Sequence, residues 1–455
     1  MRLEGARGVL TNAQSKAILK NLEKKSPETS IFDRHVAIEE AINGNPLSVG
    51  NQVNLLEDGK NTYRAMLEAI RSAKHHVHME SYIFEADEVG QEFAAALIER
   101  VKAGLKVRLM YDSVGSNTTP PEFFKEIAAS GVEVVEFNPV TPAKMMTEGA
   151  ALNHRDHRKL TIVDGRLAFL GGINISGVYG STDGSSLGSS SDAYRSGHGM
   201  GGSGSLGGSS RGQAGSDPPF EQRPWRDTQV RVEGPVVADL QRAFLKQWER
   251  QKKEEVPEDN QLFPELKPQG PQVVRAIAGS PSDSDKGLNA FYMTLISAIE
   301  CAETEIRITN AYFVPHQELL KALKDAAKRG VDVKLILPSR TDSWLVFHAG
   351  RSYYEELLEA GVKIFERKRR LLHAKTAVID GVWSTVGSTN LDWRSLLHND
   401  ELNAVILGTE FAAQMNAIFE KDLANSGEIT LADWHNRPIQ ERLKEFSARA
   451  WSRFL

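Results

Sequence analysis

The chain repeats itself, and this repeat constrains its fold more than any other feature. The segment AIRSAKHHVHMESYIF begins at Ala69, and its counterpart AIECAETEIRITNAYF begins at Ala298; each has the pattern of a helix end followed by an alternating strand. In both copies the same series follows: helix, buried strand, helix, strand, and two short strands around an Asp-Gly turn. Such alternation is typical of an α/β layered fold. The repeat therefore predicts two pseudo-twofold-related α/β/α lobes with a shared site between them.

The repeat also suggests how the chain divides. In chain order we expect an N-terminal helical extension (1–50), a first lobe (51–252), a charged, Pro-rich linker (253–270), a second lobe (271–425) and a C-terminal amphipathic helix (426–455). The stretch 180–218 is dominated by Gly, Ser and Asp, so it cannot bury enough apolar surface to offset its ordering entropy. We expect a disordered insertion there. A tolerated surface loop is the preferred interpretation, and a mobile flap over the site is the alternative.

Composition narrows the function classes. The formal net charge of -5 disfavours a nucleic-acid partner, because proteins that bind nucleic acid by counterion release usually carry a basic surplus. The one cysteine, Cys301, excludes an intrachain disulfide, and we expect it to be a small core residue. No apolar run is long enough for a membrane-spanning helix, and the N-terminal segment does not resemble a signal peptide.

Each half contains one copy of the motif H-x-K-x4-D. The motif and the Gly and Asn that follow it are His157, Lys159, Asp164, Gly171 and Asn174 in the first half, and His373, Lys375, Asp380, Gly387 and Asn390 in the second. The spacing is identical in the two sets, and two chance matches would occur on the order of once in a thousand such chains. The doubled motif is therefore a specific signal of one shared site.

The spacing suits chemistry on a phosphodiester. In a strand, residues i and i+2 share a face, so each His and Lys point to the same side. Two copies would place two imidazoles and two ammonium groups around one phosphorus atom. One imidazole can attack phosphorus while the other protonates the leaving alkoxide, and the lysines stabilise the charged oxygens. Asn174 and Asn390 can donate further hydrogen bonds to the phosphate. This chemistry requires no metal or other cofactor, and no set of carboxylate ligands lies near the motifs.

Each histidine needs an acid to orient its second ring nitrogen. Asp227 and Glu401 open strand-like runs at matching stages of the repeat, and we assign them as these orienting acids. Asp164 and Asp380 belong to the catalytic motif by position. Each lies at an Asp-Gly turn, however, so a turn-forming role is preferred over direct catalysis.

The doubled motif, each copy followed by G-G/S-x-N, resembles the phospholipase D superfamily and, within it, bacterial cardiolipin synthases. The stretches that carry the likeness are ESYIF (80–84), HRKLTIVDGRLAFLGGINIS (157–176), WRDTQVRVEGP (225–235) and LHAKTAVIDGVWSTVGSTNLDWRS (372–395). The resemblance implies a phosphohistidine on His157, with His373 as general acid and then base. It also implies transfer of phosphatidyl between two phosphatidylglycerols, giving cardiolipin and glycerol. The two N-terminal membrane-spanning helices of longer relatives are missing, so the chain is similar to the shorter type.

Several segments suggest contact with lipid. The C-terminal segment places Ile439, Leu443, Phe446, Ala450, Trp451 and Phe454 near helical spacing, with basic residues mostly elsewhere. An anionic membrane surface and the protein's own core are nearly equal alternatives for this face. The basic run 366–370 precedes the second motif and either captures anionic head groups or is a solvated face. The apolar residues of 140–146 and 344–347 either contact lipid or pack within the protein, and packing is the more ordinary interpretation. His75, His76 and His78 predict a strand with exposed histidines rather than a metal cluster.

These observations predict a transphosphatidylase that acts on anionic phospholipids. We expect peripheral association with a membrane, at the cytoplasmic face of a bacterial inner membrane, and no nucleic-acid partner; the oligomeric state is left open. The alternatives are a phospholipase D hydrolase, a nuclease of the same chemistry, and a catalytically dead lipid-binding scaffold. Intact His, Lys and Asn in both halves oppose the scaffold.

Overall fold

The structure is a computed structural model of the chain. It describes residues 3–26, 29–32, 34–35, 42, 46–140, 153–180, 223–281 and 289–451. The predicted insertion at 180–218 lies outside the described residues except for Gly180, as do 141–146 and Phe454. Within these ranges, no helix combines the length and apolar character that crossing a membrane requires.

The first half forms a seven-stranded mixed sheet. Its strands are β3 (Leu47–Glu57), β4 (His76–Ser81), β5 (Lys106–Asp112), β6 (Glu133–Phe137), β8 (Lys159–Val163), β9 (Leu167–Gly171) and β10 (Thr228–Glu233). Hydrogen bonding gives the order β6-β5-β4-β8-β9-β10-β3, in which β4, β5 and β6 are parallel and the remaining pairs are antiparallel. The parallel strands are the ones joined by crossover helices, as the βαβ geometry requires.

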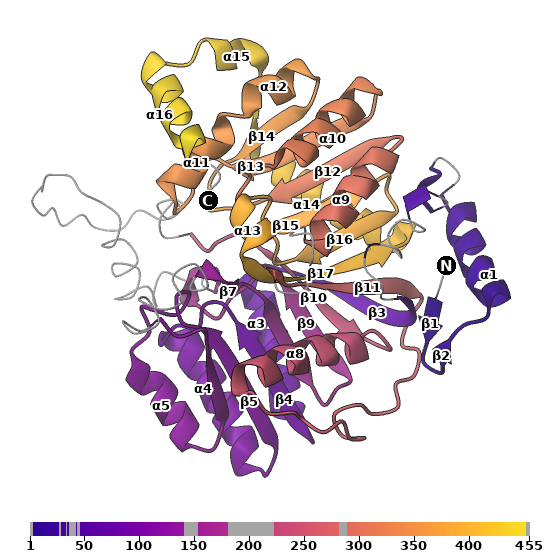
Figure 1. Ribbon diagram of the computed structural model, residues 1–455, viewed down its shortest axis with the longest axis vertical. Coiled ribbons are helices and arrows are strands. Elements are labelled where there is room, and N and C mark those ends of the chain that lie inside the picture. Colours follow the sequence, from indigo (N-terminus) through magenta and orange to yellow (C-terminus); the bar gives the residue numbers. More distant parts are fainter. Residues whose placement is uncertain are drawn as a thin grey trace, which may run out of the picture.

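The second half repeats this sheet. Its strands are β11 (Gln272–Gly279), β12 (Glu305–Asn310), β13 (Asp332–Pro338), β14 (Lys363–Arg367), β15 (Lys375–Ile379), β16 (Trp383–Gly387) and β17 (Asn399–Leu407). Their order, β14-β13-β12-β15-β16-β17-β11, matches the first half strand for strand. Because β11 pairs antiparallel with β3, the two sheets join into one whose strand order is the same from either end. Figure 1 shows this junction, with the first half below it and the second above.

Helices cover both faces of the joined sheet. In the first half they are α3 (Asp58–Ser72), α4 (Glu88–Lys102), α5 (Pro121–Ala129), η2 (Gly177–Tyr179) and α8 (Val237–Lys252). In the second they are α9 (Ala290–Cys301), α10 (Gln317–Lys328), α11 (Trp344–Arg351), α12 (Tyr354–Glu359), α13 (Trp393–Leu397) and α14 (Thr409–Leu423). One core lies under α3, α4 and α5, and a second under α9 and α10. A third core joins α8 and α14 to strands of both halves, so apolar packing holds the lobes together.

The two ends of the chain are less purely helical than expected. The N-terminal part contains β1 (Leu3–Gly5), β2 (Gly8–Val9) and α1 (Asn12–Lys24), and β1 pairs with the start of β3. The C-terminal part contains β18 (Ser426–Ile429), α15 (Leu431–His435) and α16 (Ile439–Ala450), and β18 extends the second sheet by pairing with β14. These strands have two to four residues, too short for an alternating pattern to reveal them.

The expectation of exposed histidines on β4 is wrong for two of the three. His75 precedes the strand and is exposed, but His76 and His78 are buried. The reason is α8, which covers this face of the sheet: the His78 ring stacks on Phe244 at a centroid distance of 4.7 Å, and Gln241 lies 3.1 Å from its Nδ1. Cys301 is buried, as expected for a core residue.

Candidate active site

Each H-x-K segment pairs with an extended segment of the opposite half. β7 (Arg155–Asp156) pairs in parallel with the start of β17, and the amide of His157 donates to the carbonyl of Asp400 at 2.9 Å. In the same way, Leu372 forms a bridge with Arg226, whose carbonyl accepts from the amide of His373 at 2.8 Å. The residues that follow Asp400 and Arg226 are Glu401 and Asp227. The pairing therefore brings each acid beside the histidine of the other half.

The acids bond to the histidines crosswise. The Nδ1 atom of His157 lies 3.0 and 3.1 Å from the carboxylate oxygens of Glu401, and Nδ1 of His373 lies 2.7 Å from Oδ2 of Asp227. All four side chains are buried. Because each carboxylate accepts from Nδ1, it holds that ring in one tautomer and leaves Nε2 for the substrate. The sequence placed both acids near the histidines; the exchange between halves is seen only in the structure.

The two motifs share one electrostatic centre. Burial, and then the charges of Lys159 and Lys375, hold the pKa of the His157 imidazole well below its usual range, and His373 acts in the same direction. Burial also lowers the pKa of Lys159 to about 7 and that of Lys375 to about 8. The charge of Lys375 also lowers the pKa of Lys159 across the junction. A cluster of this kind favours the binding of an anion, which restores the charged form of each cation.

The two histidines differ in their surroundings. Burial and then Lys375 lower the pKa of His373, but Asp227 opposes them, both by its charge and by its hydrogen bond. Burial raises the pKa of Glu401 to about 7, so this acid carries less negative charge near neutral pH. The carboxylate that supports an imidazolium most strongly is therefore the one beside His373.

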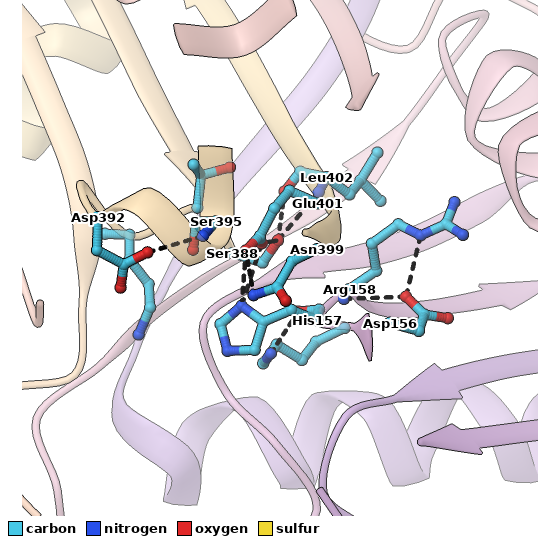
Figure 2. Close-up of polar contacts among 12 residues, drawn as sticks. Asp156, His157, Arg158, Ser388, Asp392, Ser395, Asn399, Glu401 and Leu402 are labelled. Atoms are coloured by element: carbon cyan, nitrogen blue, oxygen red, sulfur yellow. Dashed lines mark hydrogen bonds and ion pairs between the residues drawn. The ribbon is translucent and has the colours of Figure 1, made fainter. Parts of the chain in front are cut away.

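Further residues of the site were not found by sequence reasoning. Glu401 accepts from Ser388 Oγ at 2.5 Å and from Asn399 Nδ2 at 3.4 Å, and Figure 2 shows these contacts beside His157. Tyr82 packs edge-on against the His157 ring at 4.9 Å. Asn399 lies two residues before Glu401. Because residues i and i+2 of a strand share a face, the sequence could have identified Asn399 once Glu401 was assigned.

His373 has aromatic neighbours of its own. The Trp225 ring lies 5.4 Å from the His373 ring, and the Tyr179 hydroxyl lies 3.2 Å from Nδ1. Trp225 precedes Asp227 by two residues, so it also shares the face of its acid. Tyr179 lies on η2, five residues after Asn174, and no periodic sequence pattern there indicates that it belongs to the site.

The two motif aspartates lie away from the imidazoles. Each follows the far end of the strand that the motif lysine begins, a separation of about 16 Å for five extended residues. Asp164 accepts from the backbone amides of residues 74–76, and Asp380 accepts from those of 303–305. Both have positive φ, 54° and 50°. These contacts argue against the catalytic grouping of Asp164 and Asp380 and support the turn-forming role.

The two motif asparagines are both buried but differ in their side-chain hydrogen bonds. The side-chain Nδ2 of Asn174 donates to the Tyr179 hydroxyl at 2.9 Å. The side-chain Oδ1 of Asn174 accepts from the backbone amide of Ile83 at 3.1 Å. Asn390 is buried, and among the described residues its side-chain oxygen has no hydrogen-bond partner. Asn174 thus orients Tyr179, whose hydroxyl lies 3.2 Å from Nδ1 of His373, and contact of either asparagine with a phosphate stays a prediction.

Two further groups of charged residues lie outside the active site: the basic run 366–370 and a cluster of two acids and a histidine. In the basic run, Arg367 is buried against Asp422, and Arg370 bonds to Asp58 and to backbone carbonyls, so these two are structural. Lys368 and Arg369 are exposed. Among the described residues, a cluster with metal-ligand spacing is formed by Glu355, Glu359 and His435, on α12 and the end of α15 rather than among the active-site residues.

Comparison with known proteins agrees with this geometry. The family described as "Cardiolipin synthase, PLD-like domain" matches residues 66–179 and 295–423, one segment in each half. The cardiolipin synthase of Alkalihalophilus pseudofirmus is 35% identical over 412 residues, covering 90% of this chain and 74% of that protein. Cardiolipin synthase 1 of Bacillus anthracis is 31% identical over 440 residues, covering 94% and 78%.

A solved structure supports the fold. The phosphatidylserine synthase of Haemophilus influenzae superposes with a TM-score of 0.64 at 13% identity, over 92% of this chain and all of that one. An identity this low speaks for the architecture alone. The family match and the relatives show that the chain belongs to the phospholipase D superfamily, in the family of cardiolipin synthase PLD-like domains.

Proposed function

We propose that this protein is a cardiolipin-synthase-type phosphatidyltransferase that passes a phosphatidyl group between anionic glycerophospholipids through a phosphohistidine. The observation that carries the proposal is the crosswise pair of buried His–acid hydrogen bonds, His157 with Glu401 and His373 with Asp227. The family membership and the names of the relatives support the same activity.

In the first half-reaction, Nε2 of His157 attacks the phosphorus of phosphatidylglycerol. The bond from phosphorus to the glycerol head-group oxygen breaks, and His373 gives its Nε2 proton to that oxygen as glycerol leaves. In the second, the head-group hydroxyl of another phosphatidylglycerol gives its proton to His373 and attacks phosphorus. The phosphorus–nitrogen bond then breaks, releasing cardiolipin and restoring neutral His157 and protonated His373.

The assignment of roles follows the electrostatics. The nucleophile must be neutral, and burial beside two lysines keeps the pKa of His157 well below its usual range. The general acid must be protonated, and Asp227 favours the charged form of His373. A bound phosphodiester carries a negative charge, which also favours the charged forms of Lys159, Lys375 and His373. These cations then stabilise the charge that develops on the equatorial oxygens.

The proposal extends to where the enzyme works. Its substrates are membrane lipids, so we place it at a membrane surface, on the cytoplasmic face of a bacterial inner membrane. The substrate is an anionic phospholipid rather than a nucleic acid. Lys368 and Arg369 remain exposed in the basic run and are candidates for attracting anionic head groups.

Labelled phosphatidylglycerol in mixed micelles tests the function directly. Cardiolipin and glycerol as products support transfer. Phosphatidic acid alone would mean that water is the acceptor and that the enzyme is a hydrolase. No turnover of any phospholipid, with cleavage of single-stranded DNA or RNA, would move the activity to nucleic acid. Acid-labile label on the wild type and none on His157→Ala supports the nucleophile; label retained in that variant would indicate His373.

A further inference from the structure

One end of the second half exposes a group of large apolar side chains. Eight large apolar side chains among the described residues are exposed, and five of them belong to α11, to α16 or to the residue that follows α16. These five are Trp344 (55% exposed), Ile439 (73%), Leu443 (61%), Phe446 (78%) and Trp451 (58%). We call them the α11–α16 patch. Figure 1 shows α16 lying against α11, with α11 nearer to the junction of the two halves.

Helix α16 is packed with its apolar face outward. Its buried residues are Glu445 and Ala448, which are 2% and 0% exposed. Glu445 pairs with Arg437 at 2.9 Å, and with Arg351 of α11 at 3.9 Å. A helix that serves the protein's own core buries its apolar stripe and exposes its charges. Here ion pairs and an alanine dock the helix, so the apolar stripe remains for something outside the described chain.

The patch lies beside the active site. α11 follows β13, whose C-terminal end is at the same sheet edge as that of the parallel strand β12, and the last residue of β12, Asn310, pairs with Lys375. Asp342 precedes Trp344 by two residues, and its charge contributes to the pKa of Lys375. At the other end of α11, Gly350 packs so closely on Phe313 that an added Cβ would lie 2.5 Å from its carbonyl oxygen. Phe313 pairs in turn with Leu391, next to Asn390.

Basic side chains outnumber acidic ones along α16 itself, although Lys444 pairs with Glu441 and Arg449 pairs with Glu356 of α12. Along α16 the exposed or half-exposed charged side chains are three basic, Arg442, Lys444 and Arg449, and one acidic, Glu441. Tryptophan residues begin the patch on α11 and end it after α16. An apolar helix face with flanking basic residues and terminal Trp is the pattern of a helix that lies in the bilayer interface, where indole rings are favoured.

From these observations we infer that the α11–α16 patch docks on the surface of an anionic phospholipid bilayer and holds the sheet edge at which Lys375 lies close to it. This inference rests on the proposed function for its choice of partner, because a substrate with acyl chains must reach the site from a bilayer. The patch would lie parallel to the membrane, with its apolar side chains at the boundary between the head groups and the acyl chains. Lipid would then enter the site without crossing water.

Vesicle binding by the full chain tests this surface. In Leu443→Ser/Phe446→Ser, two of the patch side chains become polar without disturbing the core. We expect its affinity for phosphatidylcholine vesicles containing phosphatidylglycerol to fall about 10-fold or more, since two apolar side chains of this size no longer enter lipid. The matched control is Val9→Ser/Met293→Ser, which removes two exposed apolar side chains outside the patch and should bind as wild type does. Brominated lipid should quench tryptophan fluorescence in wild type, and less so in Trp344→Phe/Trp451→Phe.

Activity measurements separate docking from chemistry. With long-chain phosphatidylglycerol in vesicles, Leu443→Ser/Phe446→Ser should lose activity in proportion to its binding; with a monomeric short-chain phosphatidylglycerol it should match wild type. Unchanged vesicle binding by this variant would overturn the inference. So would a wild-type dimer that the variant dissociates while both bind vesicles equally, because the patch would then serve a second copy. If wild type turns over no lipid yet binds vesicles through the patch, the proposed function fails and the docking surface stands.

Discussion

Replacing Asp227 by Asn separates the two half-reactions. Oδ2 of Asp227 lies 2.7 Å from Nδ1 of His373, and both groups are buried. Asparagine keeps the volume, and its oxygen can still accept from the amide of Thr228, as Oδ1 of Asp227 does at 2.7 Å. What disappears is the negative charge that favours protonated His373. An amide N–H facing Nδ1 would also move the ring proton to Nε2, the wrong tautomer for a general base.

The size of the effect follows from the geometry. Two unit charges about 4 Å apart interact by about 4 kcal/mol at an effective dielectric constant of 20, and one charge-assisted hydrogen bond contributes about 1.5–3 kcal/mol net. Loss of between about 2 and 4 kcal/mol in the transition state corresponds to a rate decrease of roughly 30-fold to 1,000-fold. We therefore expect Asp227→Asn to slow turnover of phosphatidylglycerol by roughly 30-fold to 1,000-fold, with little change in thermal stability.

A substrate with a good leaving group isolates the role. Phosphatidyl-p-nitrophenol releases an anion that needs no general acid, so Asp227→Asn should retain the burst of p-nitrophenol. Its second half-reaction still needs His373 as base, so the phosphatidyl-enzyme should accumulate and be trapped by denaturing the enzyme at neutral pH. The matched variant is Glu401→Gln, which weakens the support of the nucleophile and should slow the burst itself. A normal burst in Glu401→Gln with none in Asp227→Asn would refute the assignment and make His373 the nucleophile.

Three further substitutions test other parts of the structure. Lys375→Met removes a positive charge that lowers the pKa of His157, so that pKa should rise by on the order of one unit and the low-pH limb of the burst rate should move to higher pH; an unchanged limb would contradict the electrostatic account. Asp380→Asn should cost about 1–3 kcal/mol in urea unfolding but change kcat less than about threefold, because its carboxylate serves backbone amides; a catalytic loss without a stability loss would contradict this. Asp422→Asn should lower the free energy of unfolding by about 3–5 kcal/mol, because two buried arginines lose their acid, and a stable variant would show that they are not dependent on it.

Much of the architecture was predictable because it depends on local pattern. The strand and helix periods repeat in the same order in both halves, and the structure converts that repeat into a sheet with the same strand order from either end. The common orientation of His and Lys in each motif also follows from a local rule, the period of two in an extended chain. These features need no knowledge of distant contacts.

What the sequence could not reveal depends on contacts between distant segments. The two acids occupy equivalent places in the repeat, so spacing alone does not say which histidine each one meets. That choice is made by the pairing of β7 with β17 and of Leu372 with Arg226. The burial of His76 and His78 likewise depends on α8, which lies more than 150 residues further along the chain. For α16, periodicity indicates an apolar face but not its direction, which the ion pairs of Glu445 decide.

The surroundings of the two histidines depart from the symmetry of the repeat, and the proposed mechanism gives the two rings opposite roles. In a strict twofold arrangement the two rings would have the same intrinsic affinity for a proton, so a pair that shares one proton could carry it on either ring. The structure differs around the two rings: Glu401, with its pKa raised to about 7 by burial, faces His157, whereas Asp227 favours the charged form of His373. Tyr82 packs on the His157 ring, and the alignment of the two repeats puts Ala311 at the equivalent position. The repeat thus supplies two equivalent frames, and the proposed division of labour, with one ring attacking and the other transferring protons, follows from a few differences between them.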